Sequence, residues 1–171
     1  MLQRPAADEH APYYGTYVSL VPEGDVCDHM RAQLHETIAL LSGVNDAQAA
    51  RAYGPGKWTL KEALLHVIDA ERVFSYRMLR VARGDATPLP GFEQDDWVPE
   101  SGANSRSVAS LLLEFSAVRA ATLLLMESIE PAAWTRRGTA SEKPVSARAL
   151  AYICAGHERH HQRIFRERYL A

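Results

Sequence analysis

Three histidines near the C-terminus have a spacing that could bind a metal ion. They lie in the run Gly156-His157-Glu158-Arg159-His160-His161. In an α-helix, residues four apart lie about 40° from each other on one face, so His157 and His161 could ligate the same ion. His160 lies about 100° from His161 and fits this pair less well. The face is expected to point into a protein core, because it also carries Leu150, Ile153, Cys154 and Ile164.

Two other interpretations of these histidines stay open. A buried histidine is often only a hydrogen-bonded core residue, although two on one apolar face need partners for all their nitrogens. The string from His157 to His161 also fits the H-E-x-x-H pattern of zinc peptidases, in which Glu158 would be the general base. Such a peptidase needs a third ligand downstream, but only ten residues follow His161 and Ile164 replaces the glycine of metzincins. Any third ligand is therefore expected upstream.

The best candidate for that third ligand is His66. It lies on the flank of a predicted apolar helical stripe, with Trp58, Glu62 and Ala70 at intervals of four. Four-helix bundles build metal sites from side chains on facing helices. His29 and His35 have no polar companion at ligand spacing, so these two and His10 are expected to be surface or packing residues.

Four amphipathic segments must position these side chains. Apolar residues recur every three or four positions in each, and the segments begin at the capping residues Asp25, Thr59, Ser107 and Ser146. They end near Gly43, Gly84, Pro131 and the C-terminus. With no convincing strand and no repeat, the sequence predicts an all-α, antiparallel four-helix bundle over residues 25–171, preceded by an irregular N-terminal arm over 1–24. The segment 85–104 is too long for a simple connection.

Composition excludes several other classes of protein. The chain has 171 residues, 47% hydrophobic and 23% charged, which suits one globular domain. A net charge of −2 gives no basic excess for nucleic acid or an anionic membrane. The sequence shows no signal peptide and no stretch of 18 apolar residues. Two cysteines do not form a disulfide framework, so we expect a cytoplasmic protein in which Cys154 is a packing residue.

Several short motifs together resemble the DinB-like superfamily, also called YfiT-like. They are Tyr53-Gly54-Pro55-Gly56-Lys57-Trp58-Thr59, Lys61-Glu62, His66, Asp69-Ala70-Glu71-Arg72, Ala82-Arg83-Gly84-Asp85, Thr87-Pro88-Leu89-Pro90-Gly91-Phe92 and Gly156-His157-Glu158 with His160-His161. The resemblance implies an up-down-down-up bundle in which His66, His157 and His161 hold one divalent metal ion. Three imidazoles leave positions open for a substrate, and they suit Zn, Ni, Cu or Fe. Glu62 and Glu158 are candidates to orient an imidazole through its second nitrogen.

The resemblance also implies a reaction, because known relatives transfer bacillithiol or isomerise substrates with mycothiol. A metal lowers the pKa of a bound thiol, so the first expectation is a bacillithiol-type S-transferase that acts on electrophilic small molecules. The alternatives are a metal-dependent hydrolase and a non-enzymatic, stress-related metal-binding bundle. The expected substrate entrance is formed by residues 53–58 and 85–97. A homodimer is expected from the resemblance and from the apolar Phe92 and Trp97.

Overall fold

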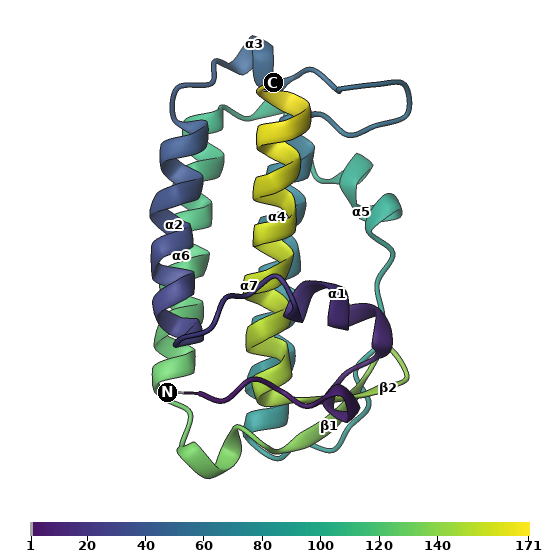
Figure 1. Cartoon of the computed structure of the whole chain (residues 1–171). Helices are drawn as coiled ribbons and strands as arrows, with labels where there is room; N and C mark the ends of the chain where they lie inside the picture. Colours follow the sequence, from purple (N-terminus) through teal and green to yellow (C-terminus); the bar gives the residue numbers. More distant parts are fainter. Residues whose placement is uncertain (1) are drawn as a thin grey trace.

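Four long helices form the bundle in the computed structural model, which describes residues 2–171. They are α2 (Val26–Leu41), α4 (Leu60–Ala82), α6 (Val108–Glu127) and α7 (Ala147–Ile164), continued by a short π-helical turn at Phe165–Tyr169. Helices α2 and α7 run in one direction, and α4 and α6 run in the other (Figure 1). The expected all-α, up-down-down-up bundle is confirmed. Helix α4 packs against α7 and α6, and α2 packs against the same two helices from the opposite side.

The four long helices begin where the capping residues predict. Asp25 accepts a hydrogen bond from the backbone of Cys27, and Thr59 forms a reciprocal capping box with Glu62. The hydroxyls of Ser107 and Ser146 accept from the backbone N–H groups three residues ahead. Each bond satisfies a donor that a helix would otherwise leave unpaired at its first turn. The start of the histidine-bearing helices is thus fixed by local chemistry.

A long crossover joins α4 to α6 because these consecutive helices run in parallel. The chain must return along the whole bundle before α6 can begin, which explains why the segment 85–104 exceeds an ordinary connection. Part of it forms α5 (Gln94–Glu100), which flanks the bundle beside α4 (Figure 1). The remaining short helices are α1 (Gly15–Val18), α3 (Asp46–Ala49) and the 3₁₀ turns Ala7–Glu9, Pro12–Tyr14, Ala103–Ser105 and Pro131–Ala133.

A small hairpin precedes α7, where no strand was expected. Strands β1 (Arg137–Ala140) and β2 (Lys143–Ser146) pair antiparallel, with Arg137 opposite Ser146. The two-residue turn of the hairpin places Ser141 and Glu142 at positive φ. Glycine in these positions would have indicated such a turn, whereas serine and glutamate do not. Four-residue strands with mixed side chains show little alternation in the sequence, so the expectation that the chain has no strand was wrong here.

The N-terminal segment is more ordered than an irregular arm. It crosses the outer face of α7 (Figure 1), and the buried Glu9 forms an ion pair with Arg148 and accepts from Ser146. The segment approaches α7 closely at Gly156, where an added Cβ would lie 2.0 Å from the carbonyl oxygen of Tyr17. Only glycine admits α1 at this distance, so residue 156 fixes the segment directly beside the histidines.

The core has two apolar halves with polar residues between them. One half surrounds Met30, Phe74 and Ile153, and the other surrounds Leu64, Phe115 and Phe165. Buried polar groups from all four long helices lie at the level between the halves: Gln33, Thr37, His66, Glu71, Arg119, His157, Glu158, His161 and Gln162. A buried layer of this kind requires internal partners for its charges and hydrogen bonds. It is therefore the first place to look for chemistry.

Helix α6 is apolar enough to cross a membrane by length and composition alone. In this fold it is one of the four bundle helices, and it contacts both α2 and α4. Its middle residue, Arg119, is fully buried in the polar layer and bonded to carboxylates. Its outward face is unusually apolar, since Leu113 and Leu124 are 74% and 67% exposed.

Candidate metal centre

His66, His157 and His161 meet in the polar layer, as the spacing and the resemblance predict. One nitrogen from each ring lies within 4.8 Å of the others, and all three side chains are buried. The Nε2 atoms of His66 and His157 are 3.1 Å apart. His66 comes from the second turn of α4, and the other two come from successive turns of α7. His160 points elsewhere, against the ring of Tyr17, and is not part of this cluster.

Burial keeps the three imidazoles neutral. It lowers the pKa of His66 to about 4, although the negative charge of Asp95 acts in the opposite direction. Burial and the neighbouring imidazoles lower the pKa of His157 and His161 well below the usual value. A neutral imidazole has one nitrogen with a free lone pair, which is the form that ligates a metal.

The geometry fits a transition-metal ion. Two nitrogens bound to tetrahedral Zn at about 2.0–2.1 Å would lie roughly 3.4 Å apart, close to the separation of the two Nε2 atoms. Nδ1 of His161 is buried without a hydrogen-bond partner among the described residues. An uncompensated polar atom in a core needs an explanation. Coordination of a metal ion through this nitrogen would satisfy it.

A cavity of about 290 Å³ leads from His161 to the surface. It is lined by the segment 53–58, in particular Tyr53, Lys57 and Trp58, and by Asp95 of α5. The ring of Trp58 lies 4.9 Å from that of His66, centre to centre. Both segments expected at the substrate entrance therefore contribute to this cavity. Three protein ligands with an open side are typical of a catalytic metal site rather than a structural one.

Asp95 is the site residue that the sequence analysis missed. It is the only carboxylate that lines this cavity within residues 2–171, and it lies on the short helix of the crossover. The acidic run Glu93, Asp95 and Asp96 was a weak signal, since charge clusters on loops are usually solvated. Only the return of the crossover along α4 brings this carboxylate close to an imidazole 29 positions earlier in the chain.

The two carboxylates expected to orient imidazoles have other partners. Glu62 accepts from the backbone of Thr59 and from the side-chain amide of Asn104, which completes the helix cap. Glu158 accepts from Thr37 at 2.7 Å and from Arg119 at 2.6 Å. Neither forms a hydrogen bond with an imidazole among the described residues. This corrects the expectation for both residues, and Glu158 also does not face the cavity as a peptidase base would.

Glu158 belongs instead to a buried ion network beside the histidines. Arg119 donates to both oxygens of Glu71, at 2.9 and 2.8 Å, to Glu158, and to the backbone carbonyl of Met30. On the other side of the network, Thr37 donates to Glu158 and Gln162 donates to Thr37. These bonds connect α2, α4, α6 and α7 at the level of the three histidines. The network can therefore hold His157 in place without touching its ring.

The cysteines provide no nucleophile for this centre. Cys154 is buried in the apolar half of the core, and burial raises the pKa of its thiol well above the usual value. Burial similarly raises the pKa of Cys27 to about 11. A thiol that stays protonated is a poor nucleophile. The expected packing role of Cys154 agrees with this environment.

Comparisons with known proteins agree with the metal-centred geometry. The sequence model of the DinB superfamily matches residues 29–165. Two curated proteins named "Putative metal-dependent hydrolase" are similar to this chain. The protein from Geobacillus kaustophilus is 27% identical over 71% of this chain and 69% of its own length. The protein from Geobacillus thermodenitrificans is 30% identical over 72% of this chain and 70% of its own length.

A solved structure shares the fold. YfiT from Bacillus subtilis, described as a "probable metal-dependent hydrolase with an unusual four-helix bundle topology", superposes with a TM-score of 0.68. The alignment covers 94% of this chain and 87% of YfiT at 13% identity. At that identity the likeness concerns the fold alone.

Proposed function

We propose, given that this chain belongs to the DinB superfamily, that it is a metal-dependent hydrolase of small esters or amides. Its metal ligands in this proposal are His66, His157 and His161. The observation that carries the proposal is the cluster of three neutral imidazoles at the end of a cavity with one carboxylate. A divalent ion held there would supply a Lewis acid that brings the pKa of water towards neutrality.

The residues around the cavity have separate tasks in this reaction. The carboxylate of Asp95 accepts the proton that the attacking water loses, because it lines the same cavity as His161. Trp58 covers His66, and Tyr17 packs edge-on against His157, so both exclude bulk water from the ligands. Lys57 provides a positive charge at the mouth for a developing oxyanion or an anionic leaving group.

Hydrolysis of 4-nitrophenyl acetate and its anilide analogue tests this proposal. Metal-loaded protein should accelerate at least one of them, and His157→Ala should abolish the acceleration. Asp95→Asn should lower kcat by about 100-fold while bound metal is retained, since loss of a general base typically costs 10²–10⁴-fold. Asp96→Asn is the matched control, because Asp96 lies next in the chain but does not line the cavity. Equal losses in the two variants would contradict the role of Asp95.

Thiol transfer is the second candidate, and the lack of a protein nucleophile favours it. With Cys154 buried, any sulfur nucleophile would have to come from a small thiol such as bacillithiol. A thiol that carries several carboxylates calls for several cations, however, and the described lining of the cavity contains Lys57 with Asp95 opposing it. We therefore rank hydrolysis first. Faster conjugation of bacillithiol to monochlorobimane, with no ester or anilide turnover, would reverse the order, and no turnover at all would favour the non-enzymatic, stress-related bundle.

The expected homodimer, small-molecule substrate and cytoplasmic location remain predictions, as does the absence of nucleic-acid and membrane partners. The exposed Leu113 and Leu124 on α6 offer a better dimer surface than Phe92 and Trp97, which stack on each other at 4.7 Å. Light scattering at micromolar protein should give a dimer mass. Leu113→Glu should shift it to a monomer if α6 forms the interface.

A further inference from the structure

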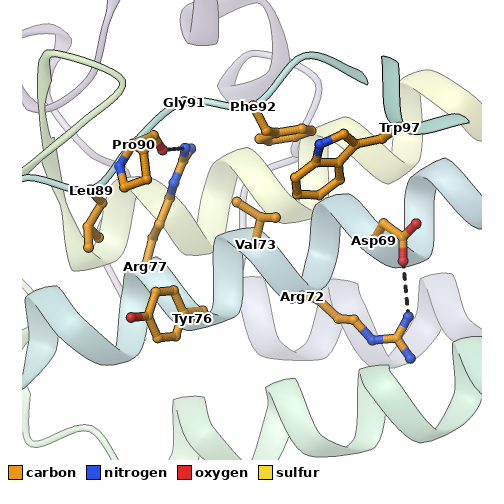
Figure 2. Close-up of a pocket in the computed structure, with 10 residues that line it drawn as sticks. All are labelled: Asp69, Arg72, Val73, Tyr76, Arg77, Leu89, Pro90, Gly91, Phe92 and Trp97. Atoms are coloured by element: carbon orange, nitrogen blue, oxygen red, sulfur yellow. Dashed lines mark hydrogen bonds and ion pairs between the residues drawn. The ribbon is translucent and has the colours of Figure 1, made fainter. Parts of the chain in front are cut away.

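A second cavity, separate from the metal centre, lies on the outer side of α4. Its volume is about 410 Å³, within the usual range for small-molecule sites. Helix α4 forms its floor, and the crossover segment 89–97 forms its opposite wall (Figure 2). The walls are mostly apolar: Val73, Tyr76, Leu89, Pro90, Phe92 and Trp97. No residue is shared with the cavity at His161.

Two stacked aromatic rings line one side of this cavity. The rings of Phe92 and Trp97 lie 4.7 Å apart at 33°, and Figure 2 shows them side by side above Val73. Trp97 is still 46% exposed. Aromatic faces of this kind favour flat apolar groups, which bind with large contact area and little loss of side-chain entropy.

Arg77 is the unusual member of this lining. It is only 3% exposed, yet no carboxylate of residues 2–171 lies within ion-pair distance of it. Its Nη2 donates to the carbonyl oxygen of Pro90 at 2.6 Å and to Ser141 at 3.2 Å. Nε and Nη1 donate to no described group, and neither is fully enclosed by protein. The guanidinium lies among the lining residues at the Pro90 end in Figure 2.

The other charges of the cavity are already compensated. Asp69, at the far end, pairs with Arg72 at 3.1 Å (Figure 2). Arg72 also pairs with Glu114 at 2.6 Å. Arg119, the other deeply buried arginine described above, has two carboxylate partners. Burial of an arginine without an anion is costly, and an incoming carboxylate could form charge-assisted hydrogen bonds with its free N–H groups.

We propose that this cavity binds a small aromatic carboxylic acid, whose ring lies on Phe92 and Trp97 and whose carboxylate pairs with Arg77. The site is distinct from the histidine cluster and does not depend on the proposed hydrolase activity. Helix α5 contributes to both cavities, with Asp95 to one and Trp97 to the other. Occupation of the second cavity would therefore hold α5 against α4.

Calorimetry with benzoate, 3-phenylpropionate and 4-phenylbutyrate tests the proposal on the protein as purified. At least one acid should bind ten-fold or more tightly than its neutral amide. Arg77→Met should reduce that ratio to about one, whereas Arg83→Met, at the C-cap of α4, should leave it unchanged because Arg83 lies outside the cavity. Trp97→Ala should weaken acid and amide together. If Arg77→Met fails to fold, Arg77→Lys should bind the acid several-fold more weakly with the ratio still above one.

Three results would overturn the proposal. The first is that none of the acids binds, and the second is that acids and amides bind equally well. The third is competition with acetohydroxamate, a small metal chelator, because competition would place the acid at the histidines. Binding that is unaffected by acetohydroxamate and lost in Arg77→Met supports the second site even if no ester or anilide is hydrolysed.

Discussion

Replacement of Arg119 by Met should strongly destabilise the protein without exposing any new surface. Arg119 is fully buried, and four hydrogen bonds leave its guanidinium, three of them to the carboxylates of Glu71 and Glu158. Methionine keeps an apolar stem of similar length but leaves two buried carboxylates without a cation. Removal of one partner from a buried ion pair typically costs about 3–5 kcal/mol. For a chain of this size, that loss corresponds to a decrease in Tm of about 6–20 °C.

Urea denaturation followed by circular dichroism measures the free energy of unfolding of both proteins. Arg72→Met serves as the control, because that arginine is 47% exposed and its ion pairs should contribute at most about 1 kcal/mol. Adding Glu71→Gln to Arg119→Met should recover part of the loss, since one unpaired charge disappears. A loss below 1 kcal/mol for Arg119→Met, or no recovery in the double variant, would refute the view that the network is a closed set of mutual partners.

Three further predictions concern α7 and the N-terminal segment that packs against it. Gly156→Ala should destabilise the fold by about 2 kcal/mol, because its Cβ would collide with the backbone of Tyr17, whereas Gly43→Ala has open space and should be neutral; equal effects would contradict the close approach. Hydrogen bonds from Arg148 lower the pKa of Glu9 from 4.5 to about 2. The ionised carboxylate should therefore contribute about 3 kcal/mol to the free energy of unfolding above pH 4.5, and progressively less towards pH 2. Urea titrations of wild type and Glu9→Gln should converge over that range, and a constant difference would disprove the assignment. Cys154→Ala should retain turnover of whichever substrate the protein accepts, and its complete loss would mean that this thiol takes part in the reaction.

The helices and two of the histidines could be predicted because local rules determine them. Capping residues fix the helix starts, and the i, i+4 spacing of His157 and His161 requires only that α7 is a helix. The prediction of His66 required more than local rules, because nothing in its own segment distinguishes a ligand from a packing residue. Its placement rested on the geometry of facing helices together with the resemblance. The hairpin before α7 escaped prediction because its short strands bear no periodic pattern.

The roles of the charged residues could not be predicted in the same way. Arg119 lies in a largely apolar helix, and its partners Glu71 and Glu158 are 48 and 39 positions away. Glu158 carried a misleading local signal, because the H-E-x-x-H pattern suggests a base beside the metal. In the fold its carboxylate instead accepts a hydrogen bond from Arg119. The roles of Asp95 and Arg77 depend on the path of the long crossover along α4. Tertiary packing determines that path, and local propensity does not.

Metal content of the purified variants tests the central claim most directly. Elemental analysis after loading with Zn and removal of excess ion should find one ion per chain in the wild type. His66→Ala, His157→Ala and His161→Ala should each lose most of it, whereas His160→Ala should retain it because that ring lies outside the cluster. A wild-type protein that retains no divalent ion, or a His160→Ala variant that loses its metal while His161→Ala keeps it, would contradict the account.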